Sequence, residues 1–315
     1  MDFESTVKKD KFILSEGAVI ELLRRSKHTQ LHQHLENALL VYDRNGRTVL
    51  SKIYSDYASI ARRADVPMVI FTPTWRANRD RIAHAQANQN VNFDATAFIR
   101  NLRDSWENNT RTFIGGLTGC KHDSYKPELG LTTPAAKSFH HYQVHQLAKA
   151  GVDFLLAATM PAIPEARGMA LAMESTGVPY IISFVINRQG SIMDGNSIEK
   201  AIGSIDTACR RAPLGYMINC AYPSFLHAHQ LPPQVLSRLV GFQANASSLD
   251  QSDLDGNTCL QVDAIDDWGN RMIQLHRRYG LKILGGCCGT GPAHLEYLVR
   301  ELGFCQSVSK ESSHG

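Results

Sequence analysis

The sequence predicts an α/β protein, a (β/α)8 TIM barrel that forms a single domain. Eight short apolar segments alternate with longer amphipathic stretches along the chain, as they do when parallel strands are covered by helices. The 315 residues suit one such barrel, which typically has about 250 residues plus insertions. A doubly wound open sheet is the less favoured alternative, because no glycine fingerprint follows the first predicted strand. We expect the barrel to span residues 1–306 and residues 307–315 to form a flexible polar tail.

The eight predicted strands are apolar, are rich in β-branched or aromatic residues and are bounded by Gly, Pro or Asn. They are residues 12–14, 67–71, 112–117, 152–157, 180–184, 214–218, 239–243 and 282–284. Helical periodicity marks the stretches between them, at residues 53–64, 97–108, 135–150, 164–176, 198–211, 264–279 and 292–302. Residues 78–92 are long and polar and are expected to form an active-site lid or a decorated loop.

Composition narrows the function class. The net charge of +3 is made of interspersed charges, which argues against a nucleic-acid partner. No apolar run approaches the roughly 20 residues of a membrane span. Seven cysteines, an odd number with two adjacent, suit metal or catalytic thiols in a reducing compartment better than a disulfide framework. We therefore predict a cytoplasmic protein that binds neither nucleic acid nor membrane.

Three cysteines follow two of the predicted strands. Cys220 comes after the segment 214–218, and Cys287 and Cys288 lie in a glycine-rich turn after the segment 282–284. Because the carboxyl ends of barrel strands share one rim, the three sulfurs can converge. Three thiolates would hold zinc and leave its fourth position open, as in catalytic zinc sites. A strained redox disulfide and a phosphate-binding loop at residues 285–291, ahead of a helix, stay open as alternatives.

Asn219-Cys220 together with Gly285-Gly286-Cys287-Cys288-Gly289-Thr290 resembles the zinc signature of the homocysteine S-methyltransferase family. Four further segments at strand ends are similar to segments of that family: Glu16-Gly17-Ala18, Thr72-Pro73-Thr74-Trp75-Arg76-Ala77-Asn78, Thr159-Met160-Pro161 and Asn245-Ala246. The resemblance covers nearly the whole predicted barrel.

This resemblance implies a zinc barrel that transfers a methyl group from an onium donor to the sulfur of homocysteine, giving methionine. It implies that Zn²⁺ is held by the catalytic cysteines Cys220, Cys287 and Cys288. The expected small-molecule partners are a thiol acceptor and a sulfonium donor, S-methylmethionine or S-adenosylmethionine, since the chain has no room for folate or cobalamin domains. The substrate-binding residues it implies are Glu16, Gly17, Trp75, Thr159, Asn219 and Asn245. Assembly into a homo-oligomer stays open.

Two positions depart from the family pattern. Where family members usually have Glu-Thr after the fourth strand, this chain has Ala158-Thr159, and the usual Asp after the first strand is Glu16. Losing a buried carboxylate opposite an ammonium costs about 2–5 kcal/mol. Either Glu16 binds the amino group instead, or the acceptor is a different thiol.

The predicted donor is a cation, and cations bind well against aromatic faces. Trp75 after the second strand is the first candidate for this contact. Phe184 and Tyr222 are two further candidates near strand ends, with packing in the core or at the rim as the alternative for each and as the favoured interpretation of Phe184. Asn219 and Asn245 are expected to hydrogen-bond either the substrate carboxylate or the sulfur ligands.

Overall fold

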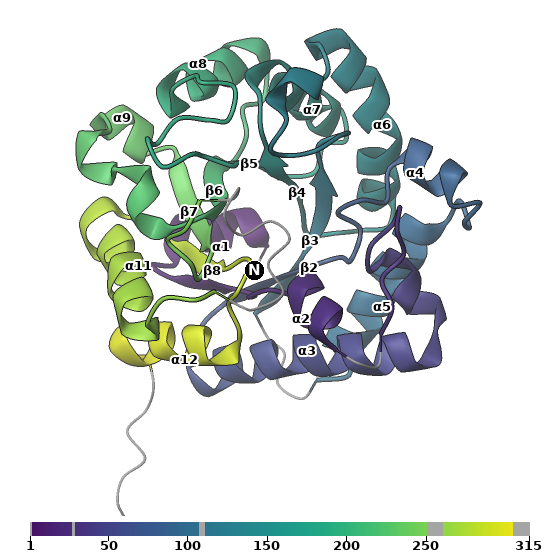
Figure 1. Cartoon of the computed structure of the whole chain (residues 1–315), viewed down its shortest axis with the longest axis horizontal. Helices are drawn as coiled ribbons and strands as arrows, with labels where there is room; N and C mark the ends of the chain where they lie inside the picture. Colours follow the sequence, from purple (N-terminus) through teal and green to yellow (C-terminus); the bar gives the residue numbers. More distant parts are fainter. Residues whose placement is uncertain (1, 27–28, 107–110, 251–260, 305–315) are drawn as a thin grey trace, which may run out of the picture.

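The computed structural model describes residues 2–26, 29–106, 111–250 and 261–304. Eight parallel strands close into a barrel in chain order, with β1 paired to β8. Figure 1 looks into the ring of strands, with the helices arranged around its outside. The predicted (β/α)8 fold is confirmed. The strands are β1 (Ile13–Ser15), β2 (Met68–Phe71), β3 (Thr112–Gly119), β4 (Phe154–Met160), β5 (Tyr180–Phe184), β6 (Gly215–Ala221), β7 (Leu239–Ala244) and β8 (Ile283–Gly286).

All seven predicted helices are present, although two begin earlier than their apolar periodicity indicates. The first turns of α3 are polar, and Asp43 fixes its start by accepting a hydrogen bond from the backbone N–H of Gly46. The α-helices are α1 (Phe3–Lys9), α2 (Ile20–Arg25), α3 (Arg44–Arg63), α4 (Arg79–His84), α5 (Val91–Asp104), α6 (Thr133–Lys149), α7 (Ile163–Glu174), α8 (Ile198–Ala208), α9 (Pro233–Leu236), α11 (Ile265–Tyr279) and α12 (Pro292–Glu301). Short 3-10 turns are η1 (Ala38–Tyr42), η2 (Pro127–Leu129), η3 (Pro223–Leu226) and η4 (Ala228–Gln230).

One apolar cluster of the core lies inside the barrel, and α1 closes one end of it. Phe3 and Val7 of α1 belong to the same apolar cluster as the inward-facing side chains of the strands. The ring of Phe3 stacks on Phe154 of β4, with centroids 3.8 Å apart. Burying each such aromatic side chain contributes roughly 1.5–3 kcal/mol. With α1 filling the amino-terminal end of the barrel, the cavity described below lies at the opposite, carboxyl end.

Residues 78–92 are a correction to the sequence prediction. Residues 78–92 do not line the cavity described below, so the lid prediction is wrong; the connection is instead decorated by α4 and leads into α5. Ile82 and Val91 pack into an apolar cluster with Leu35 and Ala77, and the side chain of Asn78 caps α4. The buried apolar residues of this segment are few, so the many polar residues around them concealed the packing.

Two further expectations concern the ends and the environment of the chain. The predicted tail, residues 307–315, lies outside the described residues. Among the helices of the described part of the chain, none combines the length and the apolar character that crossing a membrane requires.

Candidate metal and substrate site

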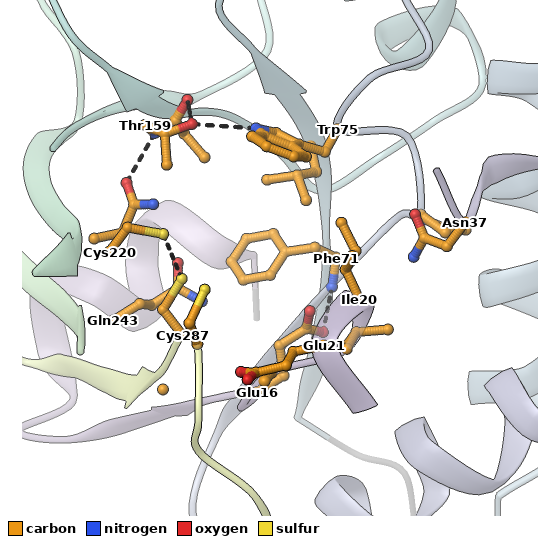
Figure 2. Close-up of a pocket in the computed structure, with 18 of the residues that line it drawn as sticks. Glu16, Ile20, Glu21, Asn37, Phe71, Trp75, Thr159, Cys220, Gln243 and Cys287 are labelled. Carbon is orange, nitrogen blue, oxygen red and sulfur yellow. Dashed lines mark hydrogen bonds between the residues drawn. The ribbon is translucent and has the colours of Figure 1, made fainter. Parts of the chain in front are cut away.

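A cavity of about 260 Å³ lies at the carboxyl ends of the strands. Figure 2 shows its wall, with side chains from several strand ends directed toward one another. Eight of the nine predicted site residues line it: Glu16, Gly17, Trp75, Thr159, Asn219, Cys220, Cys287 and Cys288. The ninth, Asn245, does not. Asn245 is buried, and its backbone N–H donates to the carbonyl oxygen of Ala221, so this asparagine supports the junction of β6 and β7.

The three cysteine sulfurs meet in this cavity. The Sγ atoms of Cys220, Cys287 and Cys288 all lie within 4.8 Å of one another, and those of Cys220 and Cys287 are 2.6 Å apart. Tetrahedral zinc with ligands at about 2.3 Å would place its sulfurs about 3.8 Å apart. The side chains therefore need only small adjustments to hold one such ion.

The ionisation of the three cysteines also favours a bound cation. Hydrogen bonds from the other two cysteines hold the pKa of Cys288 well below its ordinary value. In turn, hydrogen bonding and the charge of its neighbours raise the pKa of Cys287 well above that value. Three thiolates at this separation repel one another, so the full set ionises together only when a positive ion lies among them. All three cysteines have access to solvent, which leaves a path for a ligand.

The backbone at two strand ends adopts a left-handed conformation that side chains rarely take. Cys220 has φ +53° and Thr159 has φ +54°. Each lies at a break in strand register, between Asn219 and Ala221 in β6 and between Ala157 and Met160 in β4. For a β-branched threonine this conformation is costly. Such bulges change the direction of a side chain, and here they accompany the two residues that face the cavity.

Asn219 links the two bulges. Its Oδ1 accepts hydrogen bonds from the backbone N–H of Thr159 at 2.9 Å and from the Ser183 hydroxyl at 2.6 Å. The indole Nε1–H of Trp75 donates to Thr159 Oγ1 at 3.2 Å. Side chains after β2, β4, β5 and β6 are thus joined around the cavity, as the dashed lines in Figure 2 show for the drawn residues.

The glycine-rich turn after β8 uses nearly all of its own N–H groups. Those of Gly286, Cys287 and Thr290 donate to backbone carbonyls. The Gly289 N–H donates to the Glu21 carboxylate, and that of Gly291 to His294 Nδ1. A carboxylate thus already occupies the place of an anion, so the phosphate-loop alternative has few free donors here.

This turn requires glycine for two separate reasons. A Cβ at Gly286 would lie 2.0 Å from Thr290 Oγ1, and Gly289 has φ +80°. The Thr290 hydroxyl itself accepts from the Ala18 N–H, which ties the turn to the segment after β1.

Ala158 and Glu16, the two residues that depart from the family pattern, differ in what they present to the cavity. Ala158 presents only a methyl group. Glu16 is 5% exposed and accepts a hydrogen bond from the Phe71 N–H at 2.8 Å. Burial raises the pKa of the Glu16 carboxyl well above its ordinary value, which favours the neutral acid. Ala158 supplies no charge, and burial disfavours a negative charge on Glu16.

The sequence analysis did not predict several polar residues of the cavity wall, among them Arg76, Tyr125 and Gln243. Tyr125 lies in the connection between β3 and α6. Burial, and then the negative charge of the cysteines, raises the pKa of Tyr125 well above its ordinary value, and its hydroxyl is within reach of Cys220. Arg76 was visible within the segment after β2, but a lone arginine beside a strand is usually solvated. No sequence pattern predicts Tyr125 as a site residue, because the loop that carries it is an ordinary polar sequence.

The loop that carries Tyr125 is held by a buried carboxylate. Glu165 accepts hydrogen bonds from the N–H groups of Lys121 and Leu131 and pairs with His140 at 3.0 Å. Burial opposes ionisation of Glu165, but its hydrogen bonds prevail and lower its pKa below the ordinary value. His140 is 1% exposed, so this pair is buried.

Two of the aromatic candidates for a cation contact lie elsewhere. Phe184 is fully buried and stacks on Tyr216 with centroids 5.9 Å apart. The Tyr222 hydroxyl donates to Asp267. Neither residue lines the cavity. Trp75 does, with the guanidinium of Arg76 4.0 Å from its ring centroid.

Comparison with known proteins gives consistent results. A maize protein named homocysteine S-methyltransferase 4 is 29% identical over 179 residues, which cover 54% of this chain and 50% of the relative. A broccoli selenocysteine Se-methyltransferase is 25% identical over 189 residues, covering 58% and 53%. The chain thus spans about half the length of these curated relatives. The metallated form of the homocysteine methyltransferase MmuM from Escherichia coli has the same fold, with TM-score 0.74 and 17% identity over 94% of this chain and 98% of that one. The family model for homocysteine S-methyltransferase matches residues 13–302, and the chain belongs to that family.

Proposed function

We propose that this protein is a zinc-dependent thiol S-methyltransferase that transfers a methyl group from a sulfonium donor to homocysteine and forms methionine. The observation that carries the proposal is the convergence of Cys220, Cys287 and Cys288, whose sulfurs lie within 4.8 Å of one another in an open cavity. Family membership and the names of the relatives support the reaction class. The donor we propose is S-methylmethionine or S-adenosylmethionine.

In this proposal the three cysteines hold Zn²⁺. Bound there, zinc would lower the pKa of an acceptor thiol and keep it available as a nucleophile at neutral pH. The new bond joins the acceptor sulfur to the methyl carbon, while the bond from that carbon to the donor sulfur breaks. The electron pair stays on the donor sulfur, which becomes a neutral thioether, and the thiol proton is lost to solvent.

The residues of the chain itself position the reactants and exclude water from the cavity. Thr159 and Asn219 fix the wall beside Cys220, and reactants held in one geometry react far faster than free ones. Phe71 and Leu117 contribute apolar surface to the cavity. Tyr125, which keeps its proton, can donate a hydrogen bond to the sulfur of Cys220.

A different acceptor is the second candidate, and Ala158 favours it. The amino group of homocysteine would meet a methyl group there, and at Glu16 a carboxyl whose pKa burial raises above its ordinary value. One relative is named for selenocysteine, so acceptors vary among related proteins. A thiol without an amino group would fit this wall at least as well as homocysteine.

Two measurements test the proposal. Zinc content of the purified chain should be about one ion per chain and should be lost in Cys287→Ala but kept in Cys209→Ala, a buried cysteine outside the cavity. The zinc-loaded chain is then offered S-methylmethionine or S-adenosylmethionine with homocysteine and its amine-free analogue. Methyl transfer to homocysteine supports the first candidate, and transfer only to the analogue supports the second. Bound zinc with no transfer to any thiol would refute both.

A further inference from the structure

A buried arginine without an acidic partner lines the same cavity. Arg76 is 9% exposed. Its Nη1 donates to the carbonyl oxygens of Cys120 at 3.2 Å and His122 at 2.5 Å. The Cys120 thiol also lies within hydrogen-bonding reach of the guanidinium. Among the described residues, Nε and Nη2 donate to no oxygen or nitrogen atom, and no carboxylate oxygen lies within 4 Å of the guanidinium. Buried charges are normally paired, so this one calls for a partner from outside the chain.

The guanidinium of Arg76 is held rigidly. The two carbonyls fix one edge, and its plane lies over the Trp75 ring with the Cζ atom 4.0 Å from the centroid. Trp75 is in turn hydrogen-bonded to Thr159, and Thr159 to Asn219, the neighbour of Cys220. A preorganised arginine fork loses little entropy on binding a planar anion. Its free edge is suited to a carboxylate, which it can bind with two parallel hydrogen bonds.

Apart from the three cysteines and Glu16, the other ionisable side chains of the cavity wall that carry a carboxylate or a guanidinium have partners within the chain. Arg24 binds Glu36 at 3.0 Å. Glu21 binds Arg25 at 3.0 Å and accepts from the Gly289 N–H. Asp123 accepts from the Tyr125 N–H. Of the two arginines among the described residues of the wall, Arg24 is thus paired with a carboxylate and Arg76 is not.

We propose that Arg76 binds the carboxylate of the acceptor, so that this site selects thiol carboxylic acids by their acid group rather than by an amino group. The proposal rests on the proposed function in taking the acceptor to be a thiol. It also accounts for Ala158: an acceptor anchored through its carboxylate does not depend on a carboxylate of the protein opposite an ammonium. Trp75, with Arg76 on one face, attracts a second cation less strongly.

Binding of unreactive thioethers separates this proposal from methyl transfer. Isothermal titration calorimetry on the zinc-loaded chain would use three ligands: methionine, methylthiobutyrate (no amino group) and methylthiopropylamine (no carboxylate). A charge-assisted pair predicts that the two carboxylates bind about 10- to 100-fold more tightly than the amine. Equal affinity of the amine and the carboxylates would overturn the proposal without any variant.

Variants then assign the preference to Arg76. In Arg76→Gln the preference should fall to near unity, and Arg76→Lys should keep part of it because the charge remains without the fork. The matched control is Arg79→Gln, which replaces an exposed arginine of α4 that has its own acidic neighbour, Asp80. This variant should keep the full preference for the carboxylates over the amine. A full preference in a folded Arg76→Gln would place the carboxylate elsewhere. If carboxylate binding depends on Arg76 but no thiol is methylated, the proposed function fails while the anion site stands.

Discussion

The Oδ1 atom of Asn219 accepts a hydrogen bond from the backbone N–H of Thr159 at 2.9 Å, and this contact joins the carboxyl ends of β6 and β4. Thr159 has φ +54°, a conformation that persists only where its surroundings enforce it. Asn219 therefore acts on the cavity through the backbone of another strand, in addition to preceding Cys220 in the chain.

Replacing Asn219 with Ala should destabilise the protein. The change leaves the Thr159 N–H and the Ser183 hydroxyl without their acceptor in a buried site, which costs about 1–3 kcal/mol. Urea denaturation measures this free energy of unfolding. Asn196→Ala removes an exposed hydrogen bond to Lys200 and should change it by less than about 0.5 kcal/mol. Equal effects of the two variants would contradict the role given to Asn219.

Glu16 should make stability depend on pH with a defined sign. Its pKa is raised by burial above the ordinary value of 4.5. Its contribution to stability is complete below 4.5, where both states bind the proton, and is lost as pH rises through the folded-state pKa. Each unit of difference between the two pKa values amounts to about 1.4 kcal/mol.

The measurement for Glu16 is the free energy of unfolding at several pH values in wild type and Glu16→Gln. The variant cannot ionise at this position, so wild type should lose stability relative to Glu16→Gln as pH rises from 4.5. Glu128 lies on an exposed turn, so the free energy of unfolding of Glu128→Gln should change with pH as that of wild type does. A wild type that gains stability over Glu16→Gln with rising pH would show that Glu16 is ionised in the fold.

Tyr125→Phe should weaken methyl transfer without shifting its alkaline pH limit. Burial and the neighbouring thiolates raise the pKa of Tyr125, so the hydroxyl keeps its proton throughout the working range. Loss of one hydrogen bond to sulfur should lower kcat/KM about 10-fold. Tyr42→Phe, which removes an exposed hydroxyl bonded to Asp94, is the control. A changed alkaline limb in Tyr125→Phe would mean that the phenol titrates in the working range.

Removing zinc with a chelator should destabilise the wild type and expose its thiols. A ligand that binds only the folded state at a thousand times its Kd contributes about 4 kcal/mol. Thermal melting and reaction with a thiol reagent report the two effects, and the three cavity cysteines should become reactive together. Cys287→Ala, already without zinc, should show no further change on chelation. Identical melting of wild type with and without chelator would argue against a bound metal.

The sequence by itself determined the barrel and the meeting of the three cysteines. Strands buried on both faces are apolar throughout, so their local pattern is readable, and parallel barrel strands end at one rim, which brings Cys220 toward Cys287 and Cys288. The start of α3 and the packing of α4 were less readable, because polar residues outnumber the apolar ones there.

Only the tertiary structure decided which polar side chains face the cavity and in what charge state. Asn245 belongs to a segment that resembles the family, yet it lies outside the cavity wall, while Arg76 and Tyr125 line it. Burial by distant segments of the chain raises the pKa of Glu16 above its ordinary value. Ionisation and pairing depend on the dielectric surroundings and on partners tens of residues away in the chain, and no local pattern records either.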